Sequence, residues 1–285
     1  MWWQILVTAI VVVALSAMPM ILYGTRCRQA ETKDLHGKLE AARMPVAPES
    51  YDPREVEDLP SPVQRYFRTV LKEGQPLVAA VAMKQAGTFN MSETGEQWKP
   101  FTSTQHIVTR YPGFVWDARI RMAPTMNAFV HDAYIAGKGV LNAKLFGLLT
   151  VMEQPSTPEL AQGELMRFLA EGAWYPTALL PSQGVQWEEV DDTSAMATLK
   201  DGECTVTMSF RFDENDLIES VRADSRGRTV AGAVIPTPWE GRWGRYEQRH
   251  GMIIPIEGEV MWMLPEGAKP YWRARITELS YEFTR

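Results

Sequence analysis

The sequence predicts a mainly β protein of the α+β class, in which an N-terminal transmembrane helix precedes a curved antiparallel sheet or half-barrel with two or three covering helices. Three observations carry this prediction. A charge-free run of about 20 residues extends from Ile5 to Gly24. The period of the apolar residues changes from 3.6 to 2 at Leu77. About ten to twelve strand-like segments then follow, separated by turn signals, and so many antiparallel strands in one sheet must curl or close.

The charge-free run is long enough to cross a membrane. At about 1.5 Å per residue it spans roughly 30 Å, the thickness of the hydrocarbon layer. Trp2, Trp3 and Tyr23 fall near its two ends, where amphipathic aromatic side chains prefer to lie. A cleaved signal peptide would need Lys or Arg before the run and a small-residue cleavage site after it, and the sequence has neither. We therefore expect a retained single-pass anchor at 1–25 in the cell membrane.

The side of the membrane on which the rest of the chain lies stays open. Arg26, Arg28 and Lys33 follow the run, and only the terminal amine precedes it. The positive-inside tendency then places the following domain in the cytoplasm. The architectural analogy given below favours the opposite side.

A charged juxtamembrane segment and a proline-rich linker are expected over 26–60, followed by a single β-rich domain at 61–285. Ser61 is the expected N-cap of the domain's first helix, with Gln64 placed for a capping box. This helix should cover about 62–73.

The second expected helix begins after Thr157, covers 158–171 and carries three charged side chains on one face. Glu164, Arg167 and Glu171 stand at i, i+3 and i+7, so they lie on the same side of the helix. Either they form a solvated ion-pair ladder, or this face lines a cavity. We expect Glu164 to be solvated, and Arg167 and Glu171 to be partly buried.

The strand pattern also identifies candidate site residues. Trp116, Asp117 and Arg119 lie on one expected strand, and His131 lies on the next strand but one, beside Asp132. The polar members could supply an acid, a base and an anion clamp, or they could form a cross-strand charge ladder. Because neighbouring residues of a strand point to opposite faces, His131 and Asp132 cannot both share a site with Asp117.

Two further features bear on the strands. The segment 236–241 reads PTPWEG, a rigid loop that carries Trp239 either at the rim of a binding site or as a plain proline-fixed corner. Apolar residues change parity within the last strand, which predicts a bulge near Thr277 to Glu278.

Composition excludes several classes of function. The net charge of −6 and the pI near 5.4 argue against a nucleic-acid partner. Two cysteines cannot build a disulfide framework. The standard catalytic signatures are missing, and the four histidines are not paired at helical ligand spacing, so we expect no metal and no cofactor.

Six motifs resemble a bacterial domain-of-unknown-function family of membrane-anchored proteins over about 59–284: LPSPVQRYFRTVL, WKPFTSTQ, PGFVWDARI, ELMRFLAE, TPWEGRW and PYWRARI. Because that family is uncharacterised, the resemblance implies no activity and no catalytic residue. The expected architecture is also similar to the lipoprotein-carrier type of half-barrel, a lipid-binding fold, and this likeness is an analogy of architecture without a shared motif.

The leading functional hypothesis is a non-enzymatic module that binds a lipid or another apolar ligand near the membrane. The anchor, the ten Trp and fifteen Met residues and the wide sheet motivate it. Two alternatives stay open: a hydrolase-like enzyme that uses Asp117 or Glu171 as general base, and an envelope scaffold that binds an unknown protein partner.

Overall fold

The computed structural model describes residues 2–230 and 232–284, and within its first helix the side chains of residues 2–4, 8, 19, 20 and 22 onward. The helices are α1 (Trp2–Ala42), α2 (Ser61–Val70) and α3 (Pro158–Glu171). Short 3-10 helices are η1 (Pro53–Val56), η2 (Gly172–Trp174), η3 (Pro176–Leu179) and η4 (Pro181–Gln183).

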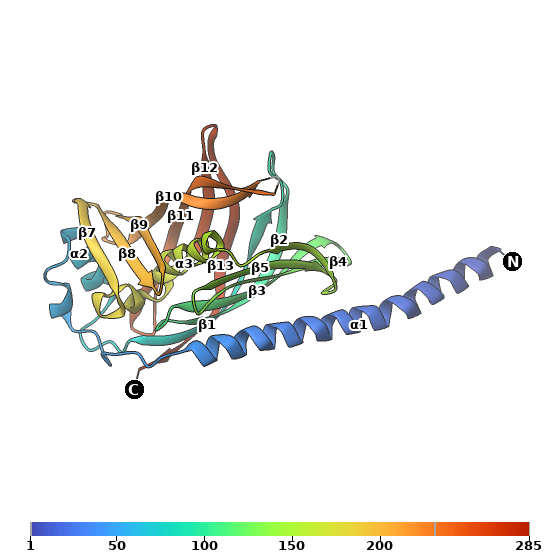
Figure 1. The fold of residues 1–285 in the computed structure, drawn as a ribbon, viewed down its shortest axis with the longest axis horizontal. Helices are drawn as coiled ribbons and strands as arrows, with labels where there is room; N and C mark the ends of the chain where they lie inside the picture. Colours follow the sequence, from blue (N-terminus) through green and yellow to red (C-terminus); the bar gives the residue numbers. More distant parts are fainter. Residues whose placement is uncertain (1, 231, 285) are drawn as a thin grey trace.

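The described strands form one 13-stranded antiparallel sheet that does not close. They comprise two meanders, β1 to β6 and β7 to β13, which join where β1 pairs with β13 (Figure 1). The edges of the sheet are β6 and β7. The strands are β1 (Val78–Asn90), β2 (Trp98–Val108), β3 (Gly113–Ala123), β4 (Met126–Ile135), β5 (Lys138–Leu145), β6 (Leu149–Gln154), β7 (Val185–Asp191), β8 (Ser194–Asp201), β9 (Cys204–Phe212), β10 (Ile218–Val230), β11 (Ala233–Arg249), β12 (Met252–Leu264) and β13 (Gly267–Phe283).

Alternation of apolar and polar residues explains the strands. In β9 the side chains of Val206, Met208 and Phe210 are buried and those between them are more exposed, so one face meets the core. The predicted bulge in the last strand is confirmed: Lys84 pairs with Glu278 and Gln85 with Ile276, which leaves Thr277 as the extra residue.

Of the two predicted domain helices, α3 has the expected bounds and α2 differs. The Thr157 hydroxyl accepts a hydrogen bond from the Leu160 backbone N–H at 3.2 Å and caps α3. The cap of α2 is Pro60 instead of Ser61, and no side chain caps the helix. The Gln64 amide donates to the carbonyls of Glu57 and Leu59, both at 2.8 Å, so the predicted capping box does not form.

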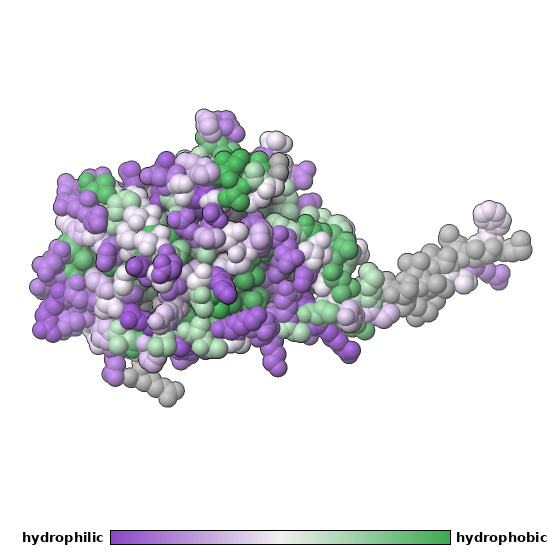
Figure 2. Space-filling view, viewed as in Figure 1, coloured by the Kyte–Doolittle hydropathy of each residue, from purple (hydrophilic) through white to green (hydrophobic). Residues whose placement is uncertain are grey.

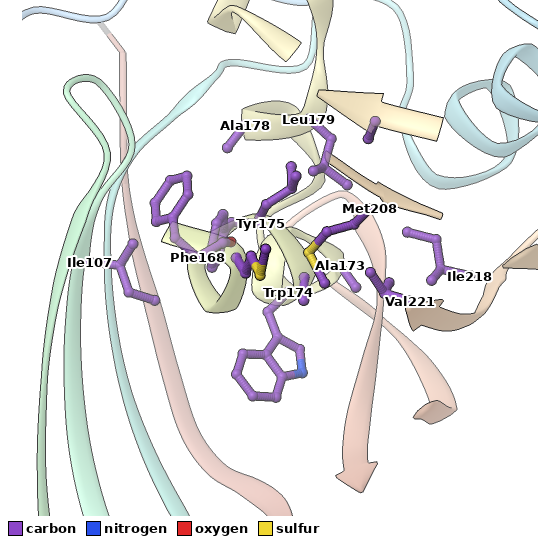
Figure 3. Close-up of a cluster of buried hydrophobic side chains, with 14 of the residues drawn as sticks. Ile107, Phe168, Ala173, Trp174, Tyr175, Ala178, Leu179, Met208, Ile218 and Val221 are labelled. Atoms are coloured by element: carbon purple, nitrogen blue, oxygen red, sulfur yellow. Dashed lines mark hydrogen bonds between the residues drawn. The ribbon is translucent and has the colours of Figure 1, made fainter. Parts of the chain in front are cut away.

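Helix α3 lies inside the curve of the sheet and contacts both arms, β3 to β5 on one side and β9 and β10 on the other. We call the face of the sheet toward α3 the concave face. Around the end of α3 and η2, buried apolar side chains from α3, the 3-10 helices and strands of both arms gather in one cluster (Figure 3). This cluster includes Ile107, Phe168, Ala173, Trp174, Tyr175, Ala178, Leu179, Met208, Ile218 and Val221.

Helix α1 docks on the opposite, outer face of the first meander through its C-terminal half. Leu35 and Leu39 are buried there against Val108, Val115 and Ala133. The N-terminal half projects beyond the domain (Figure 1). Among the side chains that the structure describes, no helix is both long and apolar enough to cross a membrane. Most side chains of the predicted span, 5–24, lie outside that description.

The proline-rich segment that follows α1 is held against the domain. Ser50 forms a bridge with Pro76, and the side chains of Tyr51 and Val56 are buried in the main core. The path from α1 to α2 is therefore fixed by packing in its second half.

Candidate ligand-binding site

An ion-pair network lies between α3 and the concave face. Arg167 donates to Asp132 Oδ2 at 2.6 Å and to Glu171 Oε1 at 2.7 Å, and the Gln105 amide donates to Glu171 Oε2 at 2.6 Å. The side chains of Arg167 and Glu171 are only 14% and 7% exposed. The solvated-ladder interpretation is therefore wrong for this face, because these charges are compensated inside the protein.

Glu164 also departs from prediction, since it was expected to be solvated and is 4% exposed. Its burial follows from the position of α3 inside the sheet, where Arg226 of β10 lies 3.8 Å from Glu164 Oε1. Burial, and secondarily the charge of Asp132, raise the pKa of Glu164 well above its usual range. Glu164 Oε2 and Asp132 Oδ1 are both buried without a donor among the described residues.

Four aromatic side chains form a continuous surface on the concave side, which we call the aromatic wall: Phe89, Trp239, Trp262 and Tyr271. The Trp239 indole N–H donates to the Tyr271 hydroxyl at 2.8 Å. The Tyr271 ring stacks on Trp262 at 5.5 Å with an interplanar angle of 20°, and Phe89 lies 5.8 Å from it. Trp239 is buried, whereas the other three are partly exposed. The wall is thus a preformed apolar surface that solvent reaches.

Two arginines border the aromatic wall and fix its orientation. Arg226 lies over the Trp239 ring at 5.1 Å and faces Glu164 of α3, so the wall is on the α3 side of the sheet. Arg228 lies over Trp262 at 5.9 Å. Its strand partner Ile235 is 46% exposed and extends the apolar surface toward the β10–β11 hairpin. Apolar surface gathers in this region of the molecule (Figure 2).

Asp117 and His131 lie on the outer face of the sheet, beneath α1. They are direct partners on neighbouring strands β3 and β4, which corrects the expected separation by one strand. Arg28 of α1 donates to both oxygens of Asp117, at 2.5 and 2.6 Å. The Thr32 hydroxyl lies 2.8 Å from His131 Nε2. Burial lowers the pKa of His131, so its ring stays neutral near pH 7.

A second ion pair completes this α1 seam, which we define as the contacts of α1 residues 28–39 with the outer face. Glu31 accepts from Lys144 at 2.7 Å and from the Asn142 amide at 3.2 Å. The seam fastens the helix to four adjacent strands, β2 to β5, and its polar groups serve attachment.

The structure therefore divides the predicted site residues between two faces. Trp116, Glu164, Arg167, Glu171 and Trp239 are on the concave side; Asp117, Arg119 and His131 are on the outer side, where Arg119 is exposed. The opposite orientation of His131 and Asp132 is as predicted.

Sequence reasoning placed Trp239 in a loop, whereas it lies within β11. Proline favours loops, but here Pro238 falls at a register shift, where Ala223 pairs with Trp239 and Arg226 with Thr237. The prediction also missed Arg226. The only local signal was its place in the alternating pattern of β10, which does not reveal its partner on α3.

The two carboxylates proposed as a general base are already engaged. Both oxygens of Asp117 accept from Arg28, and the two oxygens of Glu171 accept from Arg167 and Gln105. No group of three or more His, Cys, Asp or Glu side chains within the described part of the chain has the arrangement of a metal site.

A shallow groove of about 500 Å³ crosses β1 and β11 to β13. Both of its glutamates form ion pairs across the strands, Glu257 with Arg245 at 3.2 Å and Glu259 with Arg273. Because these charges compensate one another, the groove offers a ligand less than the aromatic wall does.

The fold and this site define a β-rich protein with a curved, unclosed sheet and an apolar concave surface. The chain belongs to a family of unknown function, DUF6920, whose model matches residues 57–281. The expected resemblance to an uncharacterised family is thus confirmed at the level of the family. No curated protein has detectable sequence similarity to the chain.

Two solved structures are distantly similar. A LolA superfamily protein from Nitrosomonas europaea has 9% identity and a TM-score of 0.32, with 77% of this chain and 93% of that chain covered. A β-barrel-like protein of the DUF1849 family from Brucella abortus has 10% identity and a TM-score of 0.22, with 72% of this chain and 99% of that chain covered. Both likenesses are too distant to transfer a ligand or a role.

Proposed function

We propose that this protein is a membrane-anchored, non-enzymatic module that binds a lipid or another apolar ligand at the aromatic wall. The observation that carries the proposal is the partly exposed cluster of Phe89, Tyr271 and Trp262 on the concave face. A contiguous aromatic surface left open to solvent costs free energy unless a ligand covers it, and concave apolar surfaces with a few polar groups are the usual form of ligand sites.

The other candidate residues have distinct roles in this proposal. Trp239 braces the wall through its hydrogen bond to Tyr271. Arg167 and Glu171 hold α3 against the concave face beside Trp116, so they shape the base of the site. Asp117 and His131 act in the α1 seam, on the far side of the sheet from the ligand.

Anchoring supports the same function. The charge-free run 5–24 continues without a break into the helix that the α1 seam fastens to the sheet. A single-pass helix held in this way keeps the domain close to the membrane, where apolar ligands partition.

The test compares two tryptophan variants of the full-length, detergent-solubilised protein by native mass spectrometry. Trp262→Ala removes a member of the aromatic wall. Trp98→Ala removes an indole that contacts Arg273 on the outer face, so it controls for the loss of a tryptophan. We expect the unaltered protein and Trp98→Ala to retain lipid, and Trp262→Ala to lose most of it. Equal lipid retention in all three proteins would place binding elsewhere, and an unaltered protein without lipid would favour a scaffold.

A further inference from the structure

The turn between β5 and β6 touches α1 at the residue where the charge-free run ends. Gly24 is so close to this turn that a Cβ atom on it would lie 2.2 Å from the Phe146 carbonyl oxygen. On the other side of the contact, a Cβ on Gly147 would lie 2.7 Å from the Gly24 carbonyl oxygen. Only two glycines allow the backbones to approach in this way, and Gly147 also has a φ of +73°. The level of the turn along α1 is therefore fixed.

Apolar side chains follow this turn on an uncovered strand. Strand β6 is an edge of the sheet and pairs only with β5 among the described strands. Leu149, Val151 and Met152 are 63%, 53% and 38% exposed. An exposed apolar edge strand promotes aggregation unless something covers it, so these side chains need an explanation.

We propose that the β5–β6 turn and the start of β6, residues 146–151, rest in the headgroup layer of a phospholipid bilayer. The inference rests on the proposed anchoring of the run 5–24. With that run in the hydrocarbon, Gly24 lies at the membrane surface, and the turn that touches it lies at the same level. The hairpins β3–β4 and β5–β6 end at the side of the domain from which α1 projects (Figure 1).

Distances agree with a shallow contact. The headgroup layer on each side of a bilayer is roughly 5–8 Å thick, from the difference between the total and hydrocarbon thickness. A strand advances about 3.3 Å per residue, so Leu149 lies within this layer and Val151, two residues further from the turn, lies near its outer boundary. Exposed Arg26 and Arg121 flank the contact and suit anionic headgroups.

The experiment uses the full chain with Cys27→Ser and Cys204→Ala, so that each new cysteine carries the only label. Leu149→Cys and Val151→Cys probe the contact. Val190→Cys on β7, at the other edge of the sheet, is the control, because Val190 is also exposed, at 52%. Each variant carries an NBD fluorophore and is reconstituted into vesicles of phosphatidylcholine and phosphatidylglycerol. A nitroxide on a fraction of the lipid headgroups serves as quencher.

We expect quenching at Leu149 to exceed that at Val190 by about threefold or more, with Val151 between them, because Leu149 lies within the headgroup layer, Val151 lies near its outer boundary and Val190 lies at the opposite edge of the sheet. Weak quenching at both Leu149 and Val190, in protein that floats with the vesicles, would overturn the membrane contact and leave the anchor intact. Protein that does not float would overturn the anchor and the contact together. Nitroxide labels at Leu149 that broaden one another would instead show a second copy on β6, which also overturns the proposal.

Discussion

Replacing Arg167 with alanine should cost the protein about 3–5 kcal/mol of folding free energy, because it leaves buried carboxylates without their cation. The Asp132 and Glu171 side chains that Arg167 binds are only 15% and 7% exposed, so water cannot substitute for the guanidinium. For a domain of this size about 1 kcal/mol corresponds to roughly 2–4 °C in the thermal midpoint. We expect Arg167→Ala to lower the midpoint by roughly 6–20 °C.

The matched control variant removes the arginine of an exposed ion pair between β9 and β10. Arg211 and Glu219 are 66% and 54% exposed, so Arg211→Ala should cost under about 0.5 kcal/mol. Calorimetry of the full-length protein in one detergent measures both midpoints. Adding Glu171→Gln to Arg167→Ala should restore part of the loss, since it neutralises one orphaned carboxylate. An Arg167→Ala midpoint within one or two degrees of Arg211→Ala would refute the buried-network argument.

Two further predictions concern stability. Burial raises the pKa of Glu164, so the folded state binds more protons than the unfolded chain. The free energy of unfolding should therefore fall as the pH rises above about 4.3, the ordinary pKa of Glu in an unfolded chain, by up to about 1.4 kcal/mol per pH unit. Glu164→Gln should flatten this decline and be more stable than the unaltered protein at pH 8, and identical urea midpoints of the two proteins across pH 4–8 would contradict it. Gly87→Ala should destabilise by about 1–3 kcal/mol, because its Cβ would lie 1.9 Å from the Arg273 carbonyl oxygen. Gly244→Ala, with no atom within 4 Å of the new Cβ, should be near neutral in the same urea titration, and equal losses would argue against the close approach.

Features that depend on neighbouring residues in the chain could be predicted from sequence. The parity change around Thr277 places the bulge, because two apolar sets on opposite parities can share one face only if a residue is inserted. Thr157 and Pro158 mark the start of α3, because a capping hydroxyl and a proline at the first helical position act locally.

Features that depend on distant partners could not be predicted. The helical period shows that Glu164 shares a face with Arg167, but burial of that face depends on the arm of the sheet that brings Arg226 to it. Pro236 and Pro238 read as a loop because proline cannot donate to a ladder. At the register shift opposite Pro238, the strand needs no hydrogen-bond donor from this residue. Such a shift in pairing cannot be recognised from the sequence of β11 alone.

The pairing of β3 with β4 connects the two faces of the molecule. Trp116 pairs with Asp132 on the concave side, and Asp117 pairs with His131 on the outer side, so consecutive residues serve α3 and α1 respectively. A slip of β4 by one residue would exchange these orientations. Arg167 would then lose Asp132 and Thr32 would lose His131 in the same event. Two independent polar contacts therefore select the same register as the apolar pattern does. The strand pair β3–β4, which contacts α3, is thus also the pair that holds α1, so the position of α3 on the concave face is tied to that of α1 on the outer face.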